Sequence, residues 1–309
     1  MTDKMIRIGT RGSQLALVQA EYMKSLLQNT HNGLEVEIEV ISTAGDRSQK
    51  SNIALSEIGG KGLFTMEIEE KLSNGEIDMA VHSAKDMPTA LPEGLALVCY
   101  PPRENVADAF ISHKAHFFDQ LEKGAVMGSA SLRRRALMWR KRPDLEMVMY
   151  RGNVGTRLEK LRDGVADATL LACAGLNRLG MSDAITSELS IEDFPPAPGQ
   201  GAITIEANVE NTRMLDLLKP LNHDETHTAL TCERAFLEEL DGSCRTPIGA
   251  HAVIDGDKLI LHGIILRPDG TEDHEARMEG TRSDARMLGL EMGKRLKLEA
   301  GTSFFEDWS

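Results

Sequence analysis

The sequence predicts an α/β protein in which two lobes face a cleft and a small α+β domain follows them. Short strand-like runs alternate with helical patterns from Ile6 to Tyr100, and the same alternation restarts over Ala125–Ala172. The C-terminal part has another order, with a long helical pattern before its strands. Between these parts the stretch Phe194–Gly201, FPPAPGQG, breaks regular structure, so we expect the chain to cross between lobes there.

The first lobe is expected to begin with a strand at Ile6–Gly9 and a helix over Ser13–Leu27, because Ser13 is a favourable N-cap residue. The alternation within Leu34–Ser42 has the period of two of a half-buried strand. The polar stretch Thr43–Gly62 ends in Gly-Gly-Lys-Gly, which predicts a mobile loop. The other expected elements are a helix over Phe64–Leu72 and strands at Ile77–His82 and Leu95–Tyr100.

The second lobe repeats this order of strand and helix, which favours parallel or mixed sheets with helices on both faces. Its expected strands are Ala125–Gly128, Glu146–Tyr150 and Ala168–Ala172, and its expected helices are Ser131–Arg142 and Val154–Arg162. Ligands of open α/β sheets bind beyond the carboxyl ends of the strands. Arg11, Ser13, Ser129 and Arg151 follow strands and are therefore expected at the cleft.

The C-terminal pattern predicts a separate α+β domain. Its expected elements are a helix over His223–Leu240, strands at Ala250–Ile254 and Lys258–Leu266 joined by an Asp255–Gly256 hairpin turn, and a final helix over Ser283–Ala300. We therefore assign residues 1–101 with 202–220 to the first lobe, residues 102–201 to the second lobe and residues 221–309 to the C-terminal domain.

The composition excludes several classes of protein. The 309 residues carry a formal net charge of -13, and only 4% of them are aromatic, which argues against a nucleic-acid partner. The start MTDKMIRIGT has no apolar core of a signal peptide, and no apolar run reaches membrane-spanning length, so a cytoplasmic location without membrane attachment is expected. The four cysteines are scattered without a C-x-x-C pair, so neither a disulfide framework nor a metal site is expected.

Arginines nevertheless gather in short stretches rich in Ser and Gly. Gly128–Arg135 reads GSASLRRR, Tyr150–Arg157 reads YRGNVGTR, and Thr10–Ser13 reads TRGS. Arginine binds carboxylate or phosphate through a rigid set of donors, and adjacent Gly and Ser let backbone N–H groups approach the same anion. In an acidic chain this pattern predicts a cleft for a small polyanionic ligand. A basic surface helix is the alternative explanation of the Arg133–Arg135 run, but the recurrence of such stretches after successive strands favours anion binding.

Two further motifs carry reactive groups. Val81–Pro88, VHSAKDMP, places Lys85 and Asp86 together after a strand, where a carboxylate can serve acid–base chemistry or stabilise a cation. A solvated turn with a surface ion pair would look the same. In Leu240–Gly249, LDGSCRTPIG, Cys244 lies in a loop beside an arginine, which favours an accessible thiol with thiolate character, although an inert buried thiol is the more common case.

Taken together and in order, these segments resemble the porphobilinogen deaminase (hydroxymethylbilane synthase) family nearly end to end. The matching motifs are IRIGTRGSQLALVQA, IGGKGLF, VHSAKDMP, SLRRRA, RGNVGTRL, PAPGQGA, LNHDET and DGSCRTPIG. The resemblance implies two periplasmic-binding-protein-like lobes and a C-terminal domain. It also implies the joining of four porphobilinogen units into a linear tetrapyrrole with release of ammonia, by a monomer that binds porphobilinogen and the growing oligopyrrole chain.

The same resemblance implies roles for individual residues. Cys244 would hold a dipyrromethane cofactor through a thioether, Asp86 would be the catalytic carboxylate, and Lys61 would lie in a loop over the cleft. The residues implied in cofactor binding are Lys85, Ser129, Ser131, Arg133, Arg134 and Arg151, and those implied in substrate binding are Arg11, Ser13, Gln19, Arg157 and Arg178. The chain departs from the commonest family pattern at Ala84, Ala130, Arg245-Thr246 and Glu57, none of which removes an implied catalytic group.

Two other readings remain open from the residues alone. A non-catalytic two-lobe protein that binds polyanions would need the arginines but neither Cys244 nor Asp86. An enzyme acting on phosphorylated substrates would also use arginine clusters, and it would hold no pyrrole cofactor.

Overall fold

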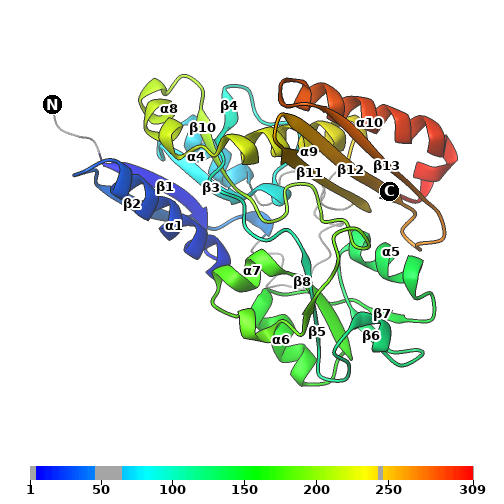
Figure 1. Ribbon diagram of the computed structural model, residues 1–309. Coiled ribbons are helices and arrows are strands. Elements are labelled where there is room, and N and C mark those ends of the chain that lie inside the picture. The colour runs from blue at the N-terminus through cyan, green and yellow to red at the C-terminus, as the bar shows by residue number, and fades with distance from the viewer. Residues whose placement is uncertain (1–4, 46–64, 243–245, 309) are drawn as a thin grey trace. The chain divides into compact units, whose positions relative to one another are not determined.

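The computed structural model describes residues 5–45, 65–242 and 246–308. The chain forms two compact units, coloured along the sequence in Figure 1. Unit 1 consists of Met1–Arg103 and Ala202–His227, and unit 2 consists of Glu104–Gly201 and Thr228–Ser309. The chain therefore leaves unit 1 and returns to it once. The predicted loop Thr43–Gly62 lies largely outside the described residues, as do Lys61, Cys244 and Arg245.

Unit 1 is built on a five-stranded mixed sheet in the order β2-β1-β3-β10-β4. The strands are β1 (Ile6–Arg11), β2 (Val36–Ile41), β3 (Met79–Ser83), β4 (Leu95–Cys99) and β10 (Ile203–Asn208). The helices are α1 (Gln14–Thr30), α4 (Met66–Ser73) and α8 (Thr212–Leu218). β1 pairs in parallel with β2 and β3, whereas β10 runs antiparallel to β3 and β4. β10, which lies between β3 and β4, thus belongs to the segment that follows the return of the chain to unit 1.

The first sheet of unit 2 has the equivalent arrangement in the order β7-β6-β8-β5-β9. Its strands are β5 (Asp108–Ser112), β6 (Val126–Gly128), β7 (Glu146–Val148), β8 (Ala168–Ala172) and β9 (Ser187–Glu188). Its helices are α5 (Leu132–Lys141), α6 (Val154–Arg162) and α7 (Cys173–Arg178). Again three parallel strands are followed by one antiparallel strand, here β5. The predicted mixed α/β class with two sheet-containing lobes is confirmed.

A second sheet in unit 2 has three antiparallel strands in the order β11-β12-β13. The elements are α9 (Asp224–Glu239), β11 (Ile248–Asp255), β12 (Lys258–Leu266), β13 (Asp273–Thr281) and α10 (Ala285–Ala300). Gly256 has φ of +61° in the turn between β11 and β12, so the predicted hairpin has glycine where the backbone needs it. Gly289 of α10 lies so close to α9 that a Cβ atom would come within 2.2 Å of a backbone oxygen. This tight approach fixes α10 against α9.

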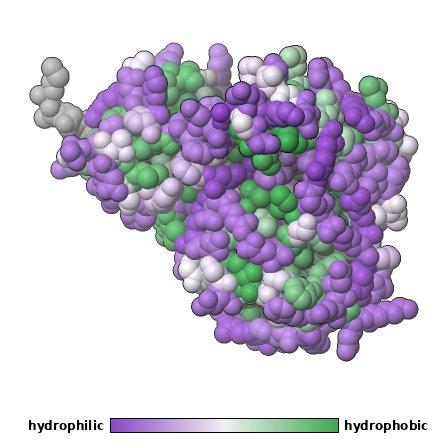
Figure 2. Space-filling view, viewed as in Figure 1, coloured by the Kyte–Doolittle hydropathy of each residue, from purple (hydrophilic) through white to green (hydrophobic). Residues whose placement is uncertain are grey.

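Apolar side chains from both faces of each sheet form the cores. In unit 1, Ile8 of β1 and Ile205 of β10 are fully buried together with Met23 of α1. In unit 2, Leu170 of β8 and Ile264 of β12 belong to one buried cluster, so the two sheets of this unit share a core. None of the helices in the described segments is long and apolar enough to cross a lipid bilayer. On the face drawn in Figure 2 polar side chains predominate.

Candidate functional site

In unit 1, polar side chains gather where β1 and β3 end. These parallel neighbours pair with Ile8 opposite Met79, so their carboxyl ends meet at one edge of the sheet. The turn Arg11–Ser13 follows β1, and the Ser13 hydroxyl accepts a hydrogen bond of 3.3 Å from the Ala16 N–H at the start of α1. Ser13 is thus the N-cap, as its sequence position predicts, and Arg11 is half-buried beside it.

The segment after β3 forms a single turn of 3₁₀ helix over Ala84–Asp86. The Ala84 N–H donates to the Ala202 carbonyl at 3.0 Å, which ties this turn to the start of β10. Met87 is buried below the turn, Lys85 is half-buried, and Asp86 is exposed. The Asp86 carboxylate is therefore exposed to solvent, while the hydrogen bond of Ala84 and the burial of Met87 fix the backbone that carries it.

Gln19 forms a hydrogen bond with Ser83, the residue that precedes this turn. It is 2% exposed on α1, and its Nε2 atom donates to the Ser83 Oγ atom at 2.9 Å. A hydrogen bond from a buried amide holds the Ser83 hydroxyl in one orientation more firmly than contact with solvent would. The structure thus brings together Gln19, Ser83 and the Lys85–Asp86 pair at one sheet edge.

On β3 the residue before Ser83 belongs to a buried polar cluster that the sequence analysis missed. The His82 Nε2 atom lies 3.1 Å from the Glu206 Oε2 atom, and Glu206 is fully buried on β10. Glu69 of α4 is also buried. Burial raises the pKa of Glu69, the hydrogen bond with Thr65 opposes this rise, and the charge of Glu206 adds to it. The alternating pattern of a strand does not reveal such partners, because they come from two other elements.

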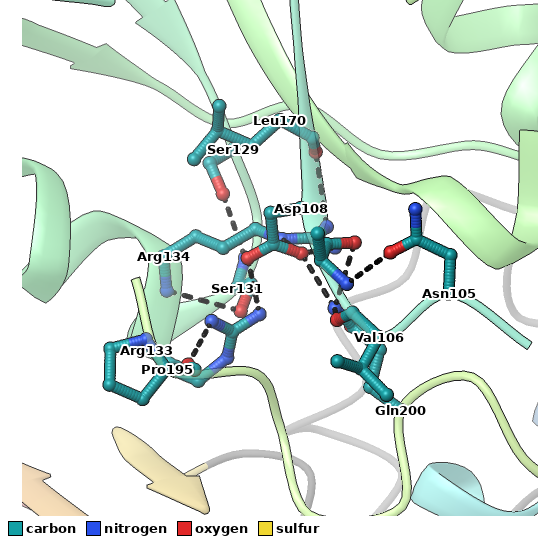
Figure 3. A network of polar contacts seen from close by, with 11 residues as sticks. Asn105, Val106, Asp108, Ser129, Ser131, Arg133, Arg134, Leu170, Pro195 and Gln200 are labelled. Carbon is teal, nitrogen blue, oxygen red and sulfur yellow. Dashed lines mark hydrogen bonds and ion pairs between the residues drawn. The ribbon is translucent and has the colours of Figure 1, made fainter. Parts of the chain in front are cut away.

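In unit 2, two arginines at the start of α5 converge on one carboxylate, as Figure 3 shows. The Arg134 Nη2 atom lies 2.7 Å from Asp108 Oδ1, and the Arg133 Nη2 atom lies 2.8 Å from Asp108 Oδ2. Asp108 is fully buried at the start of β5, and the two arginines are 3% and 6% exposed. Burial alone would raise the pKa of Asp108, but the two guanidinium charges and their hydrogen bonds outweigh burial and lower it. Asp108 is therefore ionised.

This cluster carries more positive than negative charge. Among the described residues, Asp108 is the carboxylate that forms ion pairs with Arg133 and Arg134, so one negative charge faces two positive charges. The Arg133 Nε atom is buried and has no hydrogen-bond partner among the described residues. Burial lowers the pKa of Arg133, since a charged group loses hydration there. A surplus of buried positive charge with an unused donor suits a ligand that brings carboxylates.

The third arginine of the run lies apart from this cluster. The Arg135 guanidinium stacks over the Trp139 ring at 5.0 Å from its centroid. The Arg133–Arg135 run is thus divided between two buried side chains and one that packs on the helix surface. The reading of the whole run as a basic surface helix does not hold for Arg133 and Arg134.

Serine hydroxyls shape the turn before α5. The Ser131 Oγ atom accepts from the Arg134 N–H at 3.4 Å and caps the helix. Ser129 is 4% exposed, and its Oγ atom accepts from the Ser131 N–H at 3.2 Å. The same order of strand, turn and serine cap occurs after β1 in unit 1. Both hydroxyls here are engaged with the backbone, which sets the direction in which α5 starts.

The RGNVGTR segment forms the turn after β7 and the first turn of α6. Tyr150 is fully buried, and its hydroxyl donates to the Arg157 carbonyl at 2.7 Å. The Arg157 Nε atom donates to the Gly152 carbonyl at 2.9 Å, and the guanidinium is half-buried. Burial and the positive charge of Arg134 lower the pKa of Arg157 to about 10. Arg157 therefore adds to the positive charge around Arg134, whereas Arg151 is exposed.

The remaining predicted site residues are Arg178, Lys61 and Cys244, and the structure describes only the first of them. The Arg178 Nη2 atom, at the end of α7, donates to the Gly201 carbonyl at 2.7 Å. Lys61 and Cys244 lie outside the described residues. No group of three or more His, Cys, Asp or Glu side chains suited to hold a metal ion occurs in the described part of the chain.

Comparison with solved structures finds periplasmic binding proteins. The chain aligns with the methionine binding protein MetQ at 14% identity and a TM-score of 0.45, covering 72% of this chain and 92% of that one. A periplasmic substrate-binding protein of an ABC transporter from Coxiella burnetii aligns at 14% identity and a TM-score of 0.44, covering 70% of this chain and 92% of that one.

Comparison by sequence is more specific. Residues 6–216 match the family model described as porphobilinogen deaminase, dipyromethane cofactor binding domain, and residues 227–298 match the C-terminal domain of porphobilinogen deaminase. A curated protein named porphobilinogen deaminase, from Nitrobacter hamburgensis (strain DSM 10229 / NCIMB 13809 / X14), is 49% identical over 306 residues, covering 98% of this chain and 96% of the relative. The chain therefore belongs to the porphobilinogen deaminase family.

Proposed function

We propose that the chain joins four porphobilinogen molecules head to tail into hydroxymethylbilane, a linear tetrapyrrole, releases one ammonia from each and takes up one water, which supplies the terminal hydroxyl. Its family makes it a transferase of tetrapyrrole biosynthesis that uses a dipyrromethane cofactor. The observation that carries the proposal is the buried surplus of positive charge around Asp108, because every pyrrole unit brings an acetate and a propionate group. A passive binder of polyanions would not need the exposed Asp86.

Asp86 is proposed as the catalytic carboxylate. When the C–N bond of the substrate aminomethyl group breaks, ammonia leaves and positive charge develops on the pyrrole. A carboxylate at the end of β3 can accept hydrogen bonds from pyrrole N–H groups and stabilise that charge where it forms. It can also deliver a proton to the leaving amine, a transfer that typically contributes about 10²–10⁴-fold in rate. The anchored turn below Asp86 supports this role, because it limits the carboxylate to one region.

The arginines are proposed to bind carboxylates, in two groups. Arg133, Arg134 and Arg151, with Lys85, Ser129 and Ser131, would hold the cofactor, and Arg11, Ser13, Gln19, Arg157 and Arg178 would hold substrate and the growing chain. The residues present fit the cofactor, because a group rich in carboxylates would neutralise the surplus charge beside Arg133 and give its Nε atom a partner. When bound, the cofactor supplies the free pyrrole carbon to which the first substrate unit is joined. Lys61 is proposed to lie in the loop over the cleft.

Cys244 is proposed as the attachment site. The chain has four cysteines, and the other three, Cys99, Cys173 and Cys232, are buried. Burial raises the pKa of each of these three thiols to about 12, so they remain protonated and are poor nucleophiles. Cys244 follows Gly and Ser and precedes Arg245, a setting that favours the thiolate.

Further proposals follow from the family, the composition and the sheets. We propose that the chain acts as a monomer in the cytoplasm, without nucleic acid or membrane as partner. An acidic chain with few aromatic residues supports the absence of nucleic acid. We also propose residues 102–201 and 221–309 as separate domains that pack on one shared core, since each has its own sheet.

Intact mass tests the function directly. Full-length chain made in cells that cannot produce porphobilinogen is incubated with porphobilinogen, denatured and weighed. The expected result is a covalent gain of two pyrrole units, a colour reaction with Ehrlich's reagent, and peptide mapping of the adduct to Cys244. The Cys244→Ala variant should gain nothing. A wild-type chain that stays at its polypeptide mass would favour the passive polyanion binder, and an adduct on Cys99, Cys173 or Cys232 would refute the assigned cysteine.

A further inference from the structure

Gln200 is held at the centre of the PAPGQG loop, between two glycines with left-handed backbone conformations. Gly199 has φ of +77° and Gly201 has φ of +86°. The Gly199 N–H donates to the buried Glu233 carboxylate at 2.7 Å, and the Gly201 carbonyl accepts from Arg178. A Cβ atom on Gly201 would lie 2.4 Å from a backbone oxygen of Glu104, so this conformation needs glycine. Gln200 is 1% exposed and fixed by its neighbours on both sides.

The Gln200 amide reaches the carboxylate that binds the two arginines. Its Nε2 atom donates to Asp108 Oδ1 at 2.9 Å and to the Val106 carbonyl at 2.8 Å. The same Asp108 oxygen also accepts from Arg134, while the other oxygen accepts from Arg133. Figure 3 shows the amide and the two guanidinium groups around one carboxylate. Gln200 is therefore in direct contact with the charged centre of this cluster.

The amide stabilises Asp108 without changing the charge of the cluster. A neutral donor favours the ionised carboxylate, and it adds neither a positive nor a negative charge. We propose that Gln200 is a positioning residue that keeps Asp108 bound to both arginines and leaves the cluster with one unit of surplus positive charge for a carboxylate of the ligand. This inference rests on the proposed function. It gives the PAPGQG loop, which the sequence shows only as a break in regular structure, a part in selecting an acidic ligand.

A carboxyl group in place of the amide would cancel that surplus. Gln200→Glu adds a negative charge next to Asp108, and Gln200→Met removes the hydrogen bond at similar size without adding charge. Asp108 contacts the substituted group directly, and Arg133 and Arg134 contact Asp108. Glu233 and Arg178 contact the neighbouring loop residues. The two guanidinium groups that keep Asp108 ionised despite its burial would also favour the ionised form of the carboxyl introduced at 200, so the added negative charge persists near neutral pH.

The experiment follows cofactor uptake by intact mass in full-length chain that starts without adduct, at pH 8 and pH 6. Gln200→Met should load about two- to tenfold more slowly than wild type at both pH values, as expected for the lost hydrogen bond to Asp108. Gln200→Glu should load about 100-fold more slowly at both pH values, because the introduced carboxyl stays ionised beside the two guanidinium groups and cancels the surplus charge. Thermal midpoints of all chains establish that each is folded.

A charge-exchange variant keeps the test decisive if Gln200→Glu does not fold. The double variant Asp108→Asn with Gln200→Glu again has one carboxylate, so it should fold and load within about tenfold of Gln200→Met. Equal loading of Gln200→Glu and Gln200→Met at pH 8, or a double variant that loads no faster than Gln200→Glu, would overturn the proposal. Failure of wild-type chain to gain any adduct would overturn the proposed function instead, so the two failures are distinguishable.

Discussion

Asp86 and Asp108 show how the environment divides the roles of one residue type. Asp86 is exposed after a strand, where it can meet a ligand, and Asp108 is buried at the start of a strand, where it binds two arginines. The sequence predicts Asp86 as a site residue because it follows a strand in a polar turn. It does not predict Asp108 or Gln200, since their partners come from segments 25 or more residues away along the chain.

Asp86→Asn should lower turnover by about 10²–10⁴-fold, because the amide keeps the size of the side chain and cannot stabilise positive charge or deliver a proton as the carboxyl does. The adduct should still form on Cys244. Steady-state turnover and intact mass measure the two effects. Asp216→Asn is the matched control, since Asp216 is exposed on α8 of the same unit. Turnover within threefold of wild type in Asp86→Asn would disprove the catalytic role.

At the scale of elements, strands and helices with a clear apolar period are predicted well. α6 and β12 begin and end where the sequence predicts. β13 was not predicted, because its side chains are mostly polar, with only one of them buried, and its position is set by pairing with β12. β5 and β10 were also missed. Each has a buried charged residue, Asp108 or Glu206, which interrupts the apolar pattern and is stable only with its tertiary partners.

The turn between β7 and α6 gives a prediction at this scale. Tyr150→Phe removes the hydroxyl that binds the Arg157 carbonyl, so the turn should hold the Arg157 guanidinium less firmly. KM for porphobilinogen should rise about three- to tenfold with little change in kcat, and stability should fall by about 0.5–1.5 kcal/mol. Steady-state kinetics and denaturant unfolding measure these effects.

Tyr22→Phe serves as its control, since Tyr22 is 40% exposed on α1. A loss of stability in Tyr150→Phe with unchanged KM would show that the hydroxyl supports only the fold.

For the whole molecule, one buried carboxylate in each unit makes stability depend on pH, and the two act in opposite directions. In unit 2 the pKa of Asp108 is lowered below its ordinary value of 3.8, so its contribution to stability is present above that pH and is lost as the pH falls through the folded pKa. In unit 1 the pKa of Glu69 is raised above 4.5, so its contribution is present below that pH and is lost as the pH rises through the folded pKa.

Glu69→Gln should therefore stabilise the chain at pH 8, because the amide resembles the protonated carboxyl. The thermal midpoint should rise by at least about 2 °C at pH 8, and the difference from wild type should vanish near pH 4.5. Calorimetry from pH 4 to pH 8 follows this difference. Glu70→Gln is the matched control, since Glu70 is exposed on the same helix. A midpoint at pH 8 equal to or below that of wild type would contradict the assignment.

The return of the chain to unit 1 has a consequence during synthesis on the ribosome. β10 lies between β3 and β4 in the sheet, so β4, which ends at Cys99, has no partner strand until Ile203–Asn208 has been translated. At about 5–20 residues per second, the roughly 100 intervening residues take about 5–20 seconds. The first sheet of unit 2 is complete by Glu188, before that strand is made. The nascent chain thus completes the first sheet of unit 2 before it completes the sheet of unit 1. Until β10 is made, β4 remains without a partner strand.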